Sequence, residues 1–337
     1  MSSHQKVPVL VTGGAGYIGS HAVLALMDAG WDVAVIDNLS TGFDFAVPNS
    51  VPLYEGDIAD TALLARIFAE RGTAAILHFA GSIVVPESVE KPLEYYHNNT
   101  VKSRTLIEAA LAGGVRHIIF SSTAATYGAA QVSPIGEDTP TVPINPYGWS
   151  KLMTERMLAD AAAVHPLNYG VLRYFNVAGA DPGARSGQST AGATHLIKVA
   201  CEAATGKRAG VSVFGTDFAT PDGTGVRDYI HVSDLASAHV LALEALIAEP
   251  ESSFTMNCGY GRGFSVLEVL DAVDRVTGQT IARSFEPRRA GDPPELVSDP
   301  SRLRQALPWQ PRHDDLDRII ADALQWEKRL SEIRPAH

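Results

Sequence analysis

The sequence predicts an α/β fold in which a doubly wound parallel sheet carries a smaller, mixed α/β C-terminal lobe. Two observations support this. Up to Asn176, short apolar runs alternate with helical patterns, and a glycine-rich turn joins the first run to the first helix. Beyond Asn176 comes a loop rich in Gly, Ala and Ser, followed by shorter and more mixed elements. Regular strand–helix alternation is typical of a parallel sheet covered by helices on both faces.

The elements of the first half follow from apolar periodicity and from residues that begin or end helices. Asp60 is a suitable N-cap for its helix and Gly72 a suitable C-terminal residue. Another helix contains Lys151 and begins near Pro146, where proline is tolerated. The predicted strands are 7–13, 31–37, 74–81, 117–123 and 169–176, and the other predicted helices are 17–30, 60–72 and 92–114.

Two parts of the chain are expected from this pattern. We expect residues 1–176 to form a dinucleotide-binding Rossmann domain, and the segment 228–258 to return to that domain as a strand and a helix. Residues 177–227 and 259–337 predict a lobe that binds substrate, and Ser265 with Glu268 forms a capping box within it.

Composition excludes several classes of function. The 337 residues carry a formal net charge of −11, which disfavours nucleic acid because phosphate binding needs clustered Lys and Arg. No 18-residue apolar run and no signal peptide are visible, so we expect a cytoplasmic protein with no membrane partner. The two cysteines, Cys201 and Cys258, are too few for a disulfide framework and indicate free structural thiols. The sequence predicts no metal site.

The stretch "VTGGAGYIGSH" places Gly13, Gly16 and Gly19 between a strand and a helix. Glycines there permit a tight turn and a close approach to a pyrophosphate, which the helix N-terminus also attracts. Asp37 ends the second strand, where a carboxylate accepts hydrogen bonds from ribose hydroxyls and repels a 2′-phosphate, so NAD is favoured over NADP. Asp57 follows the third strand and is interpreted either as an adenine contact or as a turn residue.

A candidate acid–base set lies in "NPYGWSKLMTER" and "FSSTAATYG". Tyr147 and Lys151 are four residues apart and share one face of a helix. A lysine ammonium near a phenol favours the phenolate, which can exchange a proton with a carbinol as a hydride leaves or arrives. Thr123 follows a strand that ends near Ser121, at the sheet edge where such folds bind ligands.

Ten segments in order make the resemblance to a known family specific. These are "TGGAGYIGSH", "DNLSTG", "EGDI", "HFAG", "KPLEYYHNNT", "FSSTAATYG", "NPYGWSKLMTE", "LRYFNVAGA", "GTGVRDYIHVSDLASAH" and "PRRAGDPPELVSD". Together they resemble the UDP-glucose 4-epimerases (UDP-galactose 4-epimerases) of the extended short-chain dehydrogenase/reductase superfamily. The resemblance spans nearly the whole chain. It implies an NAD-dependent isomerase that interconverts UDP-galactose and UDP-glucose by transient oxidation at sugar C4.

The resemblance also assigns roles to single residues. It implies that Tyr147, Lys151 and Thr123 are catalytic and that NAD stays bound. Implied cofactor contacts are Gly13, Gly16, Tyr17, Ile18, Gly19, Asp37, Asn38, Asp57, Ile58, Phe79, Ala80, Asn98, Ser121, Tyr147, Lys151 and Tyr174. Implied UDP-hexose contacts are Thr123, Asn176, His195, Leu196, Phe214, Arg227, Arg289, Asp292 and Leu296. Paired arginines suit a pyrophosphate by charge-assisted bonds, and Arg288 is interpreted as solvated.

Three positions depart from the pattern of many family members. Ile83 stands where a lysine is common, which removes a cation on the cofactor side. His195 replaces an asparagine on the sugar side and is either a substrate contact or a satisfied core histidine. Leu296 stands where some relatives have a bulky tyrosine and others a small residue, so modest activity on N-acetylhexosamines is expected.

Three other functions are possible on an NAD-binding scaffold of this kind. An epimerase of UDP-N-acetylhexosamines or UDP-pentoses on the same scaffold is the alternative. Sugar-nucleotide 4,6-dehydratases normally have acidic groups beside the catalytic hydroxyl, and "STAATYG" has none. A non-catalytic NAD sensor would be expected to lose Tyr147 or Lys151. The resemblance further implies a homodimer formed by helices near 95–112 and 150–164. The alternative interpretation is that the apolar faces of these helices belong to the core of one chain.

Overall fold

The computed structural model describes residues 6–130, 132–249, 252–289 and 292–333. Its main element is a seven-stranded sheet in the order β10–β6–β5–β4–β1–β2–β3, with all neighbours parallel. The strands are β1 (Val9–Thr12), β2 (Val33–Asp37), β3 (Leu53–Glu55), β4 (Ala75–His78), β5 (His117–Thr123), β6 (Asn168–Tyr174) and β10 (Phe254–Cys258). The predicted α/β fold with a doubly wound parallel sheet is confirmed.

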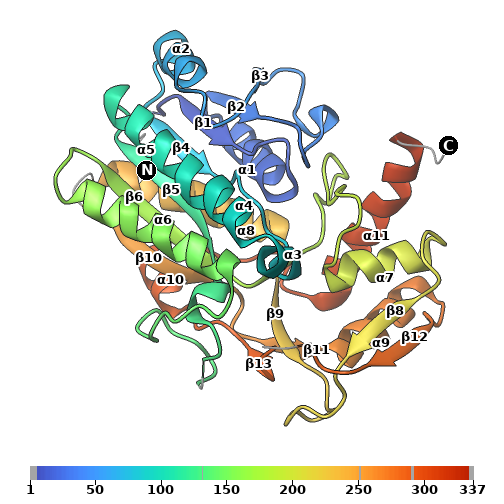
Figure 1. The fold of residues 1–337 in the computed structure, drawn as a ribbon. Coiled ribbons are helices and arrows are strands. Elements are labelled where there is room, and N and C mark those ends of the chain that lie inside the picture. Colours follow the sequence, from blue (N-terminus) through green and yellow to red (C-terminus); the bar gives the residue numbers. More distant parts are fainter. Residues whose placement is uncertain (1–5, 131, 250–251, 290–291, 334–337) are drawn as a thin grey trace.

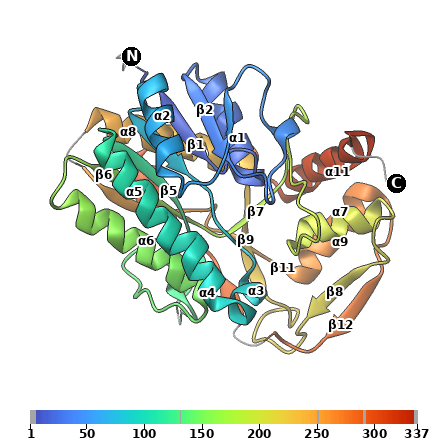
Figure 2. The same cartoon turned by 45° about the horizontal axis from the view of Figure 1, so that its top comes forward.

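Helices cover both faces of this sheet (Figures 1 and 2). On one face α1 (Tyr17–Asp28) packs against α8 (Val232–Ala248), and on the other α2 (Thr61–Arg71), α5 (Lys102–Ala112) and α6 (Pro146–Ala162) lie side by side. Alternating strand residues serve the two faces. Val9 and Val11 belong to the hydrophobic cluster around α1 and α8, whereas Leu10 belongs to the cluster around α2, α5 and α6.

Local signals set the helix boundaries. Asp60 caps α2 by accepting a hydrogen bond from Leu63 N, and Gly72 ends it in the left-handed conformation. Asn145 caps α6 by accepting from Gly148 N, so the helix begins at Pro146 as predicted. The long helix expected over 92–114 is instead interrupted: α4 (Pro92–Tyr95) leads into a π-helical turn, η2 (Tyr96–Val101), before α5. Such π-helical turns within α-helices are frequent at functional sites.

The second half builds two small sheets and a helical layer. β9 (Val226–His231) pairs with β7 (Asn176–Ala178), β11 (Gly263–Ser265) and β13 (Glu295–Leu296), while β8 (Val211–Phe214) pairs with β12 (Arg283–Glu286). The helices α7 (Leu196–Ala204), α9 (Val266–Thr277) and α11 (Leu316–Ile333) pack on one another. The remaining short elements are η1 (Asp44–Ala46), α3 (Val85–Glu90), η3 (Ala124–Tyr127) and α10 (Ser301–Ala306).

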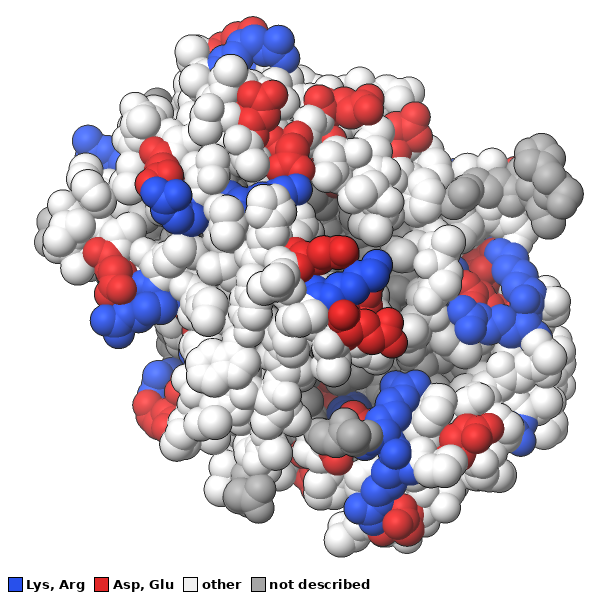
Figure 3. All heavy atoms as spheres, viewed as in Figure 1, with Lys and Arg blue, Asp and Glu red and all other residues white. Residues whose placement is uncertain are grey.

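The chain crosses between the two parts more than once. After β9, which belongs to the four-stranded sheet, α8 and β10 run back to the seven-stranded sheet. The capping box of Ser265 and Glu268 then starts α9 in the smaller lobe. On the face in Figure 3, basic and acidic side chains lie beside one another over much of the surface, and a run of basic side chains crosses its lower right. None of the helices in the described ranges is long and apolar enough to cross a membrane.

Candidate active site

The glycine turn between β1 and α1 is shaped by contacts that only glycine permits. Gly13 has a φ of +70°, and a Cβ there would lie 2.6 Å from Ala80 N. A Cβ on Gly19 would lie 2.1 Å from Gly13 O, so the turn and the helix are pressed together. Gly16 precedes α1 without a side-chain cap. The turn therefore presents the N-terminal end of a twelve-residue helix, which suits a phosphate group.

Acidic side chains follow the second and third strands, as predicted. Asp37 accepts hydrogen bonds from Ala15 N at 3.0 Å and from Leu39 N at 2.8 Å, so it braces the glycine turn. Burial raises the pKa of Asp37, and these two bonds oppose that rise. Asp57 accepts from Ala59 N and is paired with Lys102 at 2.5 Å, a partner that the sequence did not suggest. The turn interpretation of Asp57 thus has a structural basis, and its contact with adenine stays a prediction.

The segment after β4 reaches the π-helical turn. Phe79 packs 4.8 Å from the His239 ring, and Asn98 Nδ2 donates to Ser82 Oγ at 2.9 Å. Asn99 holds the same segment, since its side chain accepts from Ser82 N at 2.7 Å and donates to Ser82 O at 2.9 Å. Ile83, on the same segment, is 50% exposed. The sequence analysis missed Asn99 because the adjacent Asn98 carries the same side-chain amide.

The predicted acid–base residues come together at the carboxyl end of the sheet, where they form what we call the acid–base cluster: Ser121, Thr123, Tyr147, Lys151 and Tyr174. The side chain of Thr123 lies close enough to the Tyr147 phenol to lower its pKa. Lys151 Nζ donates to Ser121 O at 3.0 Å and lies 4.9 Å from the centre of the Phe120 ring. Ser121 Oγ and the Tyr174 hydroxyl are also hydrogen-bonded. Three neighbouring elements, β5, β6 and α6, therefore supply the cluster.

Burial governs the protonation of this cluster. The side chains of Tyr147 and Lys151 are 9% and 2% exposed. Burial raises the pKa of Tyr147, and the Thr123 side chain opposes the rise. Burial also lowers the pKa of Lys151 to about 8, against the attraction of Glu155. The two pKa values therefore move apart: the phenol of Tyr147 is held in its protonated form, whereas the ammonium group of Lys151 loses its proton more readily than a solvated lysine.

The smaller lobe presents a second group of predicted residues, the arginine surface: Phe214, Arg227, Arg289, Asp292 and Leu296. The Arg289 guanidinium lies 3.8 Å from the centre of the Phe214 ring, in a cation–π contact. Burial lowers the pKa of Arg227, and the Asp292 carboxylate opposes that effect. Arg288, by contrast, pairs with Asp217 at 2.5 Å and stacks on Phe218, so it faces another partner.

The two groups meet near Leu296. Leu296 pairs with Arg227 in the register of β13 and β9, and its side chain packs on the cluster of Ala124, Tyr127 and Ile135. Ala124 directly follows Thr123 in the chain. A ligand that spans the arginine surface and the acid–base cluster would therefore pass Leu296.

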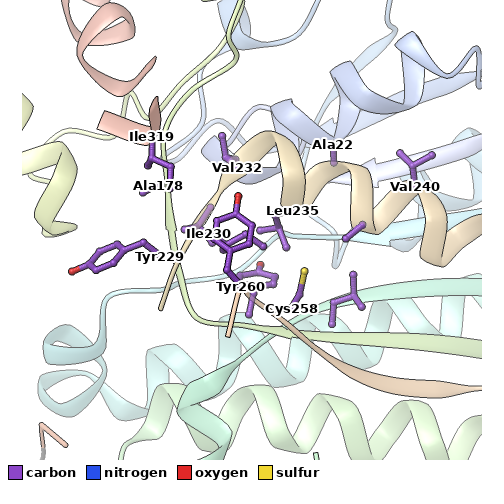
Figure 4. Packing of buried hydrophobic residues seen from close by; sticks show 14 of the residues in the cluster. Ala22, Ala178, Tyr229, Ile230, Val232, Leu235, Val240, Cys258, Tyr260 and Ile319 are labelled. Atoms are coloured by element: carbon purple, nitrogen blue, oxygen red, sulfur yellow. The ribbon is translucent and has the colours of Figure 1, made fainter. Parts of the chain in front are cut away.

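A pocket lies between β7, α7 and α11. The predicted residues Asn176, His195 and Leu196 line it, together with Tyr229, which the sequence analysis did not single out. In Figure 4 the Tyr229 ring points away from Ile230 and Leu235, and the residue is a buried member of the same hydrophobic cluster. Alternation along β9, with Tyr229 opposite Asn176, is the signal that would have found it. His195 Nδ1 is hydrogen-bonded to Gln188 Nε2 at 2.6 Å, and burial lowers its pKa.

Among the described residues, His231, His313 and Asp322 offer ligand atoms that lie within 4.8 Å of one another. His231 Nδ1 accepts a hydrogen bond from Ser233 N, which leaves the proton on Nε2, directed at Asp322 Oδ2 3.3 Å away. Arg318 Nε donates to the same oxygen at 2.7 Å. These bonds engage His231 and Asp322, two of the three residues that a metal would need, with protein groups. The absence of a metal remains a prediction.

Comparison with known proteins places these features in one family. The model of the NAD dependent epimerase/dehydratase family matches residues 9–259. The chain belongs to that family. A UDP-glucose 4-epimerase from Azospirillum brasilense is 58% identical over 324 residues, which cover 96% of this chain and 93% of that protein.

Two solved structures of the family illustrate the likeness. A UDP-glucose 4-epimerase from Stenotrophomonas maltophila, with bound NAD and formylated UDP-arabinopyranose, matches with a TM-score of 0.93 and 39% identity, covering 97% of this chain and 99% of that chain. The UDP-Glc/GlcNAc 4-epimerase from Campylobacter jejuni matches with a TM-score of 0.84 and 46% identity, covering 96% and 99%. The family assignment and the NAD cofactor predicted from the sequence are confirmed.

Proposed function

We propose that this protein interconverts UDP-galactose and UDP-glucose as an NAD-dependent 4-epimerase. The single observation that carries the proposal is the buried group of Thr123, Tyr147 and Lys151 at the carboxyl end of the sheet, in which Thr123 acts on the Tyr147 phenol and Lys151 shares its helix. Relatives at 45–58% identity over nearly the full chain are UDP-glucose 4-epimerases, which supports this function over the alternative sugars as the main activity.

The observed residues fit a bound dinucleotide. The turn at Gly13 and Gly19 leaves no room for side chains, and the uncapped start of α1 offers amide groups to a pyrophosphate. We assign the nucleotide to a path along the ends of β1, β2, β3, β4 and β5. The residues that would hold the nucleotide on that path are Gly13, Gly16, Tyr17, Ile18, Gly19, Asp37, Asn38, Asp57, Ile58, Phe79, Ala80, Asn98, Ser121, Tyr147, Lys151 and Tyr174.

The chemistry then follows from the acid–base cluster. Bound NAD supplies a reversible hydride acceptor. Tyr147 Oη takes the proton of the sugar 4-hydroxyl as C4 is oxidised, and it returns that proton when C4 is reduced on the opposite face. Lys151 stabilises the phenolate by its charge, and Thr123 Oγ1 holds the C4 oxygen by a hydrogen bond. The cofactor ends each cycle in its original redox state.

Inversion at C4 requires the sugar to present both faces while its nucleotide stays bound. We assign the diphosphate to Arg227 and Arg289 and the uridine side to Phe214 and Asp292. These anchors lie in the smaller lobe, so the sugar turns about a fixed diphosphate. The remaining substrate contacts in this assignment are Asn176, His195, Leu196, Thr123 and Leu296.

The experiment offers UDP-galactose to the purified holoenzyme without added NAD and identifies products by proton NMR. UDP-glucose should form until both sugars reach equilibrium. UDP-N-acetylgalactosamine and UDP-arabinose are offered in parallel at the same concentration. Absence of C4 inversion of UDP-galactose would overturn the proposal, and faster inversion of another sugar would reassign the substrate.

We also infer a homodimer. Leu93 on α4, Val101 on η2 and Trp149 and Met153 on α6 are 80%, 46%, 39% and 42% exposed. α4, η2 and α6 pack side by side, so these apolar side chains adjoin on one face. A second copy that places the same helices against them would bury this surface. Sedimentation of the native protein and of Leu93→Glu tests this, since the variant should sediment as a monomer.

The location and the domain limits complete the proposal. We assign the protein to the cytoplasm, a location that the free, buried thiols of Cys201 and Cys258 support. We assign NAD binding to 1–176 with 228–258, and substrate binding to 177–227 and 259–337. The return of α8 and β10 to the seven-stranded sheet supports this division, whereas β9 shows that its 228 limit falls within a strand of the smaller lobe.

A further inference from the structure

A buried ion pair lies directly behind the acid–base cluster. Glu155 on α6 and Arg173 on β6 are each 7% exposed. Arg173 Nε donates to Glu155 Oε1 at 3.0 Å and Nη2 donates to Oε2 at 2.5 Å, so both carboxylate oxygens are engaged. Ser122 Oγ donates to Oε1 as well. The proton-transfer step uses neither charge.

The pair joins all three elements that supply the acid–base cluster. Glu155 follows Lys151 by four residues and Tyr147 by eight, so the three share one face of α6. Ser122 stands between Ser121 and Thr123 on β5 and lies opposite Arg173 in the register of β5 and β6. The ion pair therefore locks α6 against the two strands that bear its catalytic partners.

The pair is held from its outer side too. Arg173 Nη1 donates to the Tyr127 hydroxyl at 3.1 Å, and that hydroxyl donates to Asn257 Oδ1 at 2.7 Å. Asn257 Nδ2 in turn donates to Ile135 O at 2.8 Å. A guanidinium with partners on both sides keeps one orientation, and so does the carboxylate that it binds.

Charge adds to geometry here. Lys151 donates to a carbonyl oxygen rather than to a carboxylate, and the Glu155 carboxylate raises its pKa through space while burial lowers it. The other titratable groups around Lys151 are Tyr147 on α6, Tyr174 on β6 and His78 on β4. Burial holds the pKa of His78 at about 3, so this imidazole stays uncharged during turnover.

We propose that Glu155 is a positioning residue whose charge keeps Lys151 protonated and whose pairing with Arg173 fixes the catalytic helix against β5 and β6. This inference rests on the proposed function, because it assigns Lys151 to catalysis. Arg173 has the complementary part, since it compensates a carboxylate that would otherwise be buried alone.

The decisive variant is Glu155→Gln in the NAD-bound enzyme, assayed with UDP-galactose across pH. Loss of the carboxylate leaves the Arg173 charge uncompensated, and both effects favour the neutral amine of Lys151. The alkaline limb of kcat should move down by about one pH unit. KM for UDP-galactose should stay within about twofold, because the arginine surface is untouched.

Three matched variants separate charge from structure. Glu155→Asp keeps the charge. The alkaline limb of its kcat profile should therefore stay near the wild-type pH, while kcat itself falls. The double variant Glu155→Gln/Arg173→Met removes both charges and should recover about half of the shift. Asp160→Asn removes an exposed carboxylate from the same helix and should leave both limb and kcat unchanged.

A direct readout keeps this test apart from the proposed function. The pKa of Lys151 is measured by NMR of ¹³C-labelled lysine, with its signal assigned from Lys151→Met. A lower pKa in Glu155→Gln supports the inference even if UDP-galactose is not turned over. An unchanged pKa overturns it, as does an equal shift in Glu155→Asp. If Glu155→Gln does not fold, the double variant decides: a lowered pKa supports the inference and a wild-type pKa overturns it.

Discussion

The acid–base cluster and the arginine surface differ most in how their side chains are held. Thr123, Tyr147 and Lys151 are 8%, 9% and 2% exposed and are bonded within the sheet edge. Arg289 and Asp292 are exposed, and Arg289 is held chiefly by its contact with the Phe214 ring. Proton transfer needs fixed atoms at short range, whereas a charged diphosphate is attracted over longer distances and tolerates mobile partners. Substitutions should therefore affect turnover at the first group and binding at the second.

The largest expected effect is at Tyr147. Tyr147→Phe removes the hydroxyl that exchanges the sugar proton, and kcat should fall by about 10²- to 10⁴-fold. Bound NAD should remain, as measured by absorbance after denaturation, because the ring stays in place. Trp149→Phe, one position beyond Gly148 on the same helix, is the control for a ring substitution. Near-normal turnover of Tyr147→Phe would remove that phenol from the mechanism.

A second effect concerns pH. The ammonium form of Lys151 predominates below its pKa of about 8 and the neutral amine above it. Support for the Tyr147 phenolate should thus be lost as pH rises through that value, and kcat should decline about tenfold for each further unit. The rate is measured at saturating UDP-galactose with protein stability checked at each pH. A rate that keeps rising beyond pH 9 would contradict this role.

Neighbouring arginines give the matching test of the arginine surface. Arg289→Ala should raise KM for UDP-galactose by about 10- to 100-fold, since a charge-assisted bond to the diphosphate is lost. Arg288→Ala should change KM by less than about threefold, because Arg288 pairs with Asp217 instead. Comparable effects of the two variants would show that the surface acts by overall charge alone.

A smaller effect is expected where the two groups meet. Leu296→Tyr adds bulk beside the cluster of Ala124 and Ile135, so activity on UDP-N-acetylgalactosamine should fall by about tenfold relative to UDP-galactose. Competition between the two sugars in one reaction, followed by NMR, measures the ratio directly. An unchanged ratio would place the N-acetyl group away from Leu296.

The smallest effect is expected at the cofactor edge. Ile83 is half exposed, so Ile83→Lys adds a solvated charge that should slow loss of bound NAD by about threefold. Dissociation is followed by fluorescence after dilution, and Ile83→Met provides the uncharged control. Equal retention in both variants would assign any effect to side-chain length.

Local sequence determined most of the framework. Alternating apolar runs predicted the parallel sheet, and Asp60, Gly72 and Ser265 marked helix ends that the structure has, because capping involves only adjacent residues. The four-residue spacing of Tyr147 and Lys151 likewise settled that they share a helix face. The domain limits and the individual site assignments stay predictions.

Only the tertiary structure decided what each of these residues touches. The pairing of Glu155 with Arg173 spans two elements, as does that of Asp57 with Lys102, and no local pattern encodes such contacts. The π-helical turn at Tyr96–Val101 interrupts a stretch whose sequence predicts a continuous helix, and within this turn the side chain of Asn99 bonds Ser82 outside the helix. Sequence alone fixed which residues lie on one face. Folding determined which face meets which strand, since that depends on contacts between residues far apart in the chain.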